Sequence, residues 1–323
     1  MTINDTSDSH QRIVLSVASL LLLTIGVGTY YSFSTFSEGN PLPIHELNRN
    51  LVTSKVNQPA EQLYNLPYFA NRKNFFNQKF VKLAWAWTTF AIVFHLISFA
   101  NHHQEQQQMK KAQEESPQKT SGEKKKETVN RSELLPSHRK TISRVFKSYV
   151  VGTLIWIALT QWFFGSCLIE RLLVLTGARC VPSNLPSGEA SSSSEPIHLD
   201  HSFCQRTWGK AKEGLDPFTI LTHKPHWSGG VDISGHAFLL TFSILLITSS
   251  TLAPSFEVLN MNRIGSLSRL YQLSIYFNLG LISFWWWMLL MTSLYFHGPA
   301  EKIIGAIVGV MSWVLTQKVV SQS

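Results

Sequence analysis

Long apolar blocks alternate with long polar segments along the chain, and this pattern predicts its elements. Most of the blocks run for about twenty residues, the length at which an α-helix crosses a hydrocarbon core. The chain is therefore predicted to be an all-α membrane protein. We expect a single polytopic domain over 1–323, built as a bundle of six transmembrane helices at about 13–33, 80–100, 145–166, 233–253, 271–296 and 303–320.

The sixth block is the shortest of the set. Its apolar stretch covers only 303–315 before polar residues follow, so a buried or re-entrant segment is the alternative to a span. Gly305, Ala306 and Gly309 are small residues of the kind that let membrane helices approach closely. We therefore predict a sixth span.

Charge is scarce, and most of it lies outside the blocks. Charged residues make up 15% of the chain, where a soluble domain carries about 25%; this excludes a water-soluble enzyme. The segment 101–147 holds eleven basic residues against six glutamates. Basic loops face the cytoplasm, and a segment rich in Gln, Glu, Lys and Ser with few aromatics is typical of disorder. We expect a disordered basic cytoplasmic loop at 101–147.

This orientation fixes the rest of the topology. Six spans place both termini in the cytoplasm and put 34–79, the loop 167–232 and the short turn around His297 on the opposite side. The basic loop also accounts for five (eleven minus six) of the eight net positive charges. It lacks interleaved aromatics or a folded module, so no nucleic-acid partner is predicted. Binding of anionic lipid headgroups by 124–126 stays open.

Ionisable side chains inside or at the ends of spans are functional candidates. His95 lies within the second span and has no acidic residue or histidine three or four positions away, which favours a structural role. His236 opens the fourth span and His297 closes the fifth. Because these two spans run in opposite directions, both imidazoles are predicted to lie at the same, non-cytoplasmic membrane face.

The segment 232–236 has the chemistry of a helix start. Ser234 or Asp232 can serve as N-cap. A helix N-terminus binds anions such as phosphate through its backbone N–H groups and dipole. Gly235 lets a ligand approach the backbone closely. We therefore expect Ser234 and Gly235 to bind phosphate beside His236.

Glu301 follows His297 after a Gly-Pro turn. It is either a first-turn carboxylate that faces the positive end of a helix, or the group that orients His297 and raises its basicity. The intervening turn leaves both roles open.

Two histidines at one face favour phosphoryl chemistry without a metal. One would attack phosphorus and carry the phosphoryl group, while the other would act as general acid and then general base. A metal or haem site is the alternative. A zinc site would need a third protein ligand, which His223 or His226 in the adjoining loop could supply.

Two segments carry a resemblance to a known family. Phe238-Leu239-Leu240 after the helix start at 232–236, and the run from Trp285 to Lys302, resemble the fat-storage-inducing transmembrane (FIT) family, six-span endoplasmic-reticulum proteins linked to lipid-droplet formation. FIT proteins are in turn similar to the lipid phosphate phosphatases, which use a Ser-Gly-His motif and a later His followed four residues on by Asp. The resemblance implies a lipid-phosphatase-like catalytic face with His236 as acid/base, His297 as nucleophile and Glu301 as the orienting carboxylate.

The activity implied is hydrolysis of the diphosphate bond of fatty acyl-CoA in the lumen, giving acyl 4′-phosphopantetheine and adenosine 3′,5′-bisphosphate. This would support lipid-droplet formation and phospholipid and membrane homeostasis, with membrane and neutral lipids as partners and no cofactor. The phosphatases' Lys-x6-Arg-Pro motif is absent, which argues against a general lipid phosphate phosphatase. It leaves Lys224, Lys302 and Arg206 as candidates to bind phosphate by location only. The alternative is a non-enzymatic protein that binds diacylglycerol or triacylglycerol.

Two further features depend on the same assignment. Cys180 and Cys204 lie in the predicted luminal loop, where a disulfide can form; a bridge and two free thiols both stay open. The Trp285–Trp287 cluster lies in mid-span. It is predicted to pack inside the bundle, with contact to an acyl chain as the alternative.

Overall fold

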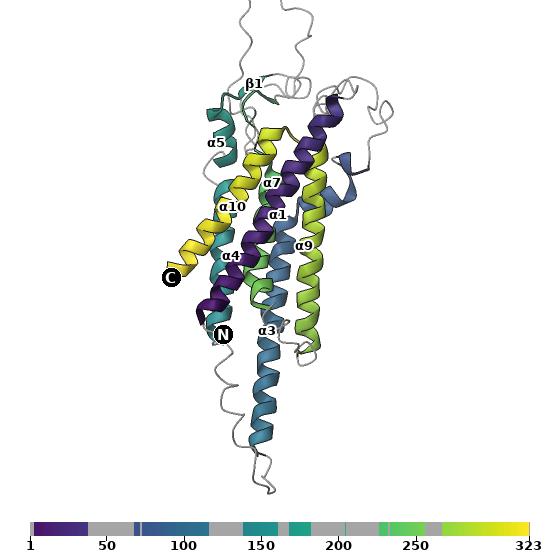
Figure 1. Cartoon of the computed structure of the whole chain (residues 1–323). Coiled ribbons are helices and arrows are strands. Elements are labelled where there is room, and N and C mark those ends of the chain that lie inside the picture. Colours follow the sequence, from purple (N-terminus) through teal and green to yellow (C-terminus); the bar gives the residue numbers. More distant parts are fainter. Residues whose placement is uncertain are drawn as a thin grey trace, which may run out of the picture.

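The computed structural model describes residues 3–37, 68–71, 73–115, 138–160, 168–181, 204, 226–231, 233–255 and 267–322. Six helices in this part of the chain are long and apolar enough to cross a membrane. They are α1 (Ile3–Ser37), α3 (Ala84–Glu115), α4 (His138–Thr160), α7 (Gly235–Ile247, continued by the π-turn η5 at Thr248–Leu252), α9 (Arg269–Tyr295) and α10 (Pro299–Gln322). They form an elongated bundle (Figure 1), and the predicted all-α membrane fold is confirmed.

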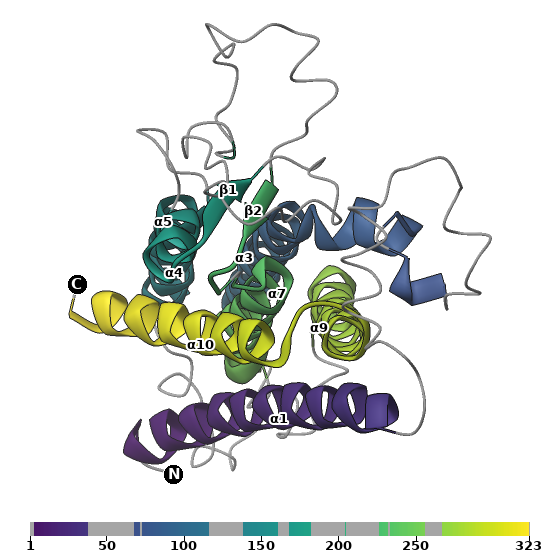
Figure 2. The ribbon, with the colours of Figure 1, turned by 90° about the horizontal axis from the view of Figure 1, so that it is seen from above.

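α7 is the central helix of the bundle. Seen from above, it is surrounded by α10, α4, α3 and α9, while α1 lies on the far side of α10 (Figure 2). Its sequence is apolar around the whole circumference, which is typical of a helix with no solvent-facing side. Ten of its thirteen residues are buried. The first turn of α7 is therefore held from several sides.

The contact of α10 with α7 depends on two glycines. A Cβ atom at Gly305 would lie 2.6 Å from the carbonyl oxygen of Ser234, and one at Gly309 would lie 2.8 Å from that of Phe238. Only a residue without a side chain fits at such distances, so the close approach predicted from the small residues is confirmed. As a result the two helices begin side by side, and the Ser234 N–H donates to the Glu301 carbonyl at 3.1 Å.

The expectation of disorder throughout 101–147 needs correction. α3 continues to Glu115 and α4 already begins at His138, so both ends of this segment are helical. The Gln, Glu and Lys residues that suggest disorder are also good helix formers, and they extend a helix whose nucleus already exists in the membrane. The remaining part, 116–137, lies outside the described residues.

Shorter elements precede α3 and α7. A 3-10 turn η2 (Tyr68–Ala70) and a π-turn η3 (Asn77–Val81) lead into α3. The segment 167–232, predicted to be a luminal loop, contains α5 (Leu168–Leu175) and the antiparallel strands β1 (Arg179–Val181) and β2 (His226–Ser228). These elements lie at the end of the bundle where α7 begins (Figure 1).

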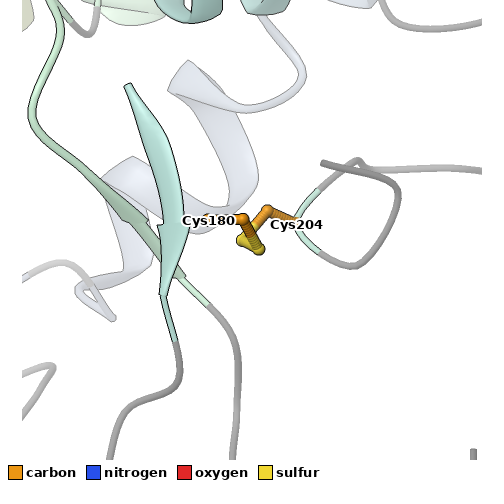
Figure 3. The surroundings of a disulfide bond; sticks show 2 residues. All are labelled: Cys180 and Cys204. Atoms are coloured by element: carbon orange, nitrogen blue, oxygen red, sulfur yellow. A yellow bond between two sulfur atoms is a disulfide. The ribbon is translucent and has the colours of Figure 1, made fainter. Parts of the chain in front are cut away.

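The strand pair anchors the approach to α7. Cys180 on β1 forms a disulfide with Cys204 (Figure 3). β2 is followed by Gly229 and Gly230, both with positive φ, and a Cβ at Gly230 would lie 2.7 Å from the Leu173 carbonyl oxygen. The tight turn therefore needs glycine, and it leads directly to the N-terminus of α7.

Candidate active site

Ser234 and Gly235 shape the N-terminus of α7. Ser234 has an extended backbone, and its Oγ accepts from the Ala237 N–H at 3.3 Å, so it is the N-cap. Asp232, the other candidate, lies outside the described residues. Gly235 is exposed, and a Cβ there would have no atom within 4 Å. The helix end therefore has open space beside N–H groups that a first turn cannot pair internally.

His297 occupies the turn between α9 and α10. α9 ends at Tyr295, Phe296 is extended, and Pro299 begins α10, as a proline at the first helical position should. His297 has a φ of 59°, and it is the only non-glycine residue with positive φ in the described part of the chain. Left-handed backbone costs an L-residue about 1–2 kcal/mol. The surrounding contacts must therefore hold this conformation.

Glu301 provides those contacts. Its Oε2 accepts from the Gly298 N–H at 2.8 Å and lies 3.3 Å from Nδ1 of His297. The carboxylate is nearly buried, which strengthens both interactions. One oxygen thus closes the first turn of α10 and faces the imidazole, so this geometry is compatible with both roles that the sequence leaves open.

His236 and His297 lie together, as the topology predicts. Their ring centroids are 6.5 Å apart, and the rings are nearly perpendicular. Both side chains are half-buried, with 20% of the His297 side chain exposed. The pair is therefore reachable from outside the bundle and lies between the starts of α7 and α10.

Lys302 differs from the expectation of a phosphate ligand. Its Nζ donates to the Ser293 carbonyl at 2.6 Å, and only 1% of the residue is exposed. The ammonium group points into the bundle and ties α10 to the last turns of α9, so a phosphate outside cannot reach it. Residue 302 lies on the inner side of α10. The sequence does not show this, because the geometry of the preceding turn decides which side of the helix each residue faces.

Several predicted residues cannot be placed. Lys224 and Arg206, the other candidate cations, and His223, a candidate zinc ligand, lie outside the described residues. Within the described part of the chain, no group of three or more His, Cys, Asp or Glu side chains is arranged to hold a metal ion. Two partners, the Gly298 N–H and the Ser293 carbonyl, cannot be predicted from the sequence, because backbone groups leave no signal in residue identity.

Comparison with known proteins identifies relatives of the chain. The sequence profile described as fat storage-inducing transmembrane protein matches residues 65–272 and 257–317. A Schizosaccharomyces pombe protein named acyl-coenzyme A diphosphatase fit1 is 30% identical over 246 residues, covering 76% of this chain and 71% of that protein. Proteins named acyl-coenzyme A diphosphatase FITM2 are 29% identical over 254 residues in Xenopus tropicalis (78% and 72% covered) and 26% over 251 residues in Homo sapiens (76% and 70%).

No solved structure matches the chain. The profile nevertheless covers most of the sequence and includes both histidines, the Gly-Pro turn and Glu301. The chain belongs to the fat storage-inducing transmembrane (FIT) family.

Proposed function

We propose that the chain is a fatty acyl-CoA diphosphatase that cleaves the P–O–P linkage of its substrate to acyl 4′-phosphopantetheine and adenosine 3′,5′-bisphosphate. The observation that carries this proposal is the pair of imidazoles, 6.5 Å apart, beside the N-terminus of α7. The names of the relatives in yeast and vertebrates support the choice of substrate.

In the first step Nε2 of His297 attacks one phosphorus of the diphosphate. Glu301 faces Nδ1, so this nitrogen keeps its proton and Nε2 carries the lone pair. A nitrogen–phosphorus bond forms as the bridging P–O bond breaks, and the other phosphate leaves with the electron pair of that bond. His236 donates a proton to the departing oxygen.

In the second step water releases the phosphoryl group from His297. His236, now neutral, accepts a proton from the water while the oxygen attacks phosphorus and the nitrogen–phosphorus bond breaks. Both products then carry a terminal phosphate, and both histidines return to their starting states. The step needs no group beyond the two imidazoles and water.

The negative charge of the reacting phosphate is met by backbone dipoles. The open space beside Gly235 faces the first turn of α7, whose N–H groups and dipole favour an anion. Such preorganised donors stabilise charge as it develops in a transition state. Lys224 and Arg206 stay candidate phosphate ligands, since Lys302 is buried.

We further propose that the chain lies in the endoplasmic-reticulum membrane with both termini in the cytoplasm and the site in the lumen. The basic residues of 101–147 favour a cytoplasmic position for that segment. The Cys180–Cys204 disulfide, at the end of the bundle where the site lies, suits an oxidising compartment. Hydrolysis of acyl-CoA there would support lipid-droplet formation and membrane homeostasis.

The test is product analysis of purified protein with fatty acyl-CoA, comparing the original chain with His297→Asn. Asparagine tolerates left-handed backbone, so the turn is kept while the nucleophile is lost. We expect the rate to fall by at least about 10³-fold, because the attacking nitrogen is gone. Equal cleavage by both proteins would overturn the assignment of His297 as nucleophile. No cleavage by the original chain would overturn the proposed activity and favour the alternative, a non-enzymatic binder of diacylglycerol or triacylglycerol.

A further inference from the structure

An apolar groove of about 260 Å³ opens on the side of the bundle, between α9 and the start of α3. Its lining consists of Phe80, Trp87, Phe277, Gly280, Leu281 and Phe284. The rings hold one another in place: Phe80 stacks on Trp87 with centroids 5.1 Å apart and meets Phe284 edge-on at 5.2 Å. Among the described residues no charged side chain lines the groove, and it lies at membrane-spanning segments, so it suits an alkyl chain.

Gly280 opens the groove. A Cβ at this position would meet no atom within 4 Å. Large exposed side chains lie on the same outer face of α9, on both sides of Gly280 along the helix. They are Leu273, Tyr276 and Trp287, which are 57%, 60% and 43% exposed. The glycine therefore leaves a notch in a row of bulky residues. That notch forms part of the groove.

The groove and the histidine pair are connected by one helix. Leu281 lies about 20 Å along α9 from Tyr295, at the rise per residue of an α-helix. Trp287 occupies the surface between them and packs edge-on against Phe69. In acyl-CoA the pantetheine arm separates the diphosphate from the thioester, so an acyl chain whose diphosphate reaches His297 must begin deeper in the bilayer. The groove lies in that direction.

We propose that this groove binds the acyl chain of the fatty acyl-CoA substrate, an assignment that rests on the proposed diphosphatase function. Lipid tails are as apolar as the groove, so the gain comes from shape and packing and not from leaving water. A chain held there places the diphosphate in register with the histidine pair. The groove thereby sets the preference for acyl-chain length.

A glycine substitution tests this directly. Gly280→Leu fills the notch with a side chain whose Cβ meets no atom within 4 Å, and it raises helix propensity, so we expect folding to be kept. Gly26→Leu is the matched control, since Gly26 on α1 is also exposed and has no atom within 4 Å of its Cβ position. We expect Gly280→Leu to raise KM for palmitoyl-CoA about tenfold, a loss of ~1.4 kcal/mol, and to leave KM for butyryl-CoA unchanged. Equal KM values for palmitoyl-CoA in the two variants would overturn the assignment.

Photocrosslinking gives a readout that does not need hydrolysis. The probe is a fatty acyl-CoA with a diazirine at the chain end, bound to the His297→Asn protein in phosphatidylcholine vesicles. We expect adducts in peptides that contain Phe80, Trp87 or 277–284, competed by palmitoyl-CoA and absent once Gly280→Leu is added. Adducts elsewhere, or adducts that triacylglycerol displaces equally well, would contradict the assignment. Adducts in the groove, together with failure of the original chain to hydrolyse acyl-CoA, would overturn only the proposed function.

Discussion

Two histidine clusters lie at opposite ends of the bundle and differ in what surrounds them. Near the start of α9, Nδ1 of His95 lies 3.3 Å from the hydroxyl of Ser274. The ring centroid of Tyr271 lies 5.4 Å from the ring centroids of both His95 and His102. Nδ1 of His102 accepts from the Ser268 N–H at 3.1 Å. Protein groups thus occupy this cluster, and His95 is buried.

Beyond the other end of α9, His236 and His297 are half-buried and lie beside two helix starts. Open space adjoins Gly235, and the His297 backbone is held in a left-handed conformation. Strain of this kind gathers at functional sites. The comparison shows that an ionisable residue in a membrane span is not by itself a site. Access, and room for an anion, distinguish the pair that we propose to be reactive from the cluster that protein groups occupy.

The largest effect that sharpens this comparison is expected from Glu301→Gln. Oε2 makes both contacts, so a neutral amide oxygen in its place still accepts from the Gly298 N–H and from Nδ1 of His297, but it lacks the negative charge that stabilises the imidazolium formed as His297 attacks. We expect kcat to fall about a hundredfold at unchanged thermal stability. The control is Glu105→Gln, an exposed carboxylate on α3. Equal kcat in both variants would limit Glu301 to capping α10.

Tyr271→Phe tests the opposite cluster. The substitution removes the hydroxyl that pairs with the Ser255 Oγ at 3.1 Å inside the bundle. We expect the free energy of unfolding to fall by about 1 kcal/mol, while activity per folded molecule stays the same. Denaturant titration in detergent, followed by assays of the folded fraction, measures both. Loss of activity without loss of stability would show that the two clusters are not separate in function.

A smaller effect is expected from Gly235→Ala. The added methyl group meets no protein atom but projects into the space assigned to the phosphate. We expect KM to rise about threefold, a change below 1 kcal/mol, with Gly26→Ala as the neutral control. An unchanged KM would place the phosphate elsewhere.

Much of this arrangement follows from sequence alone. Span lengths predict the bundle, and antiparallel spans predict that His236 and His297 meet at one face. Gly305 and Gly309 predict a close helix contact, because small residues in a membrane span have few other uses.

Other features depend on geometry that residue identity does not encode. The inward turn of Lys302 depends on the angle at which α10 begins, since one residue rotates a helix by about 100°. The left-handed conformation of His297 depends on the Gly298 and Glu301 contacts. The groove at Gly280 requires rings from α9 and from the approach to α3. These are contacts between distant segments or details of a single turn, and neither produces a periodic pattern.

The Trp285–Trp287 cluster illustrates the same limit. Trp285 is fully buried, as packing inside the bundle predicts, whereas Trp286 and Trp287 are 39% and 43% exposed. Trp286 donates to the Thr24 hydroxyl on α1 at 2.9 Å. Adjacent helical positions point in different directions, so three consecutive tryptophans cannot share one environment.

The most direct test of the account is to trap the covalent intermediate on His297. In a His236→Gln protein the first step should proceed, because a phosphate is a good leaving group, while attack by water lacks its base. After brief exposure to fatty acyl-CoA, mass spectrometry of the peptide containing His297 should show a phosphoryl-linked adduct whose mass identifies the phosphorus attacked. An adduct on another residue, or none on His297 while the substrate is consumed, would contradict the two-histidine mechanism.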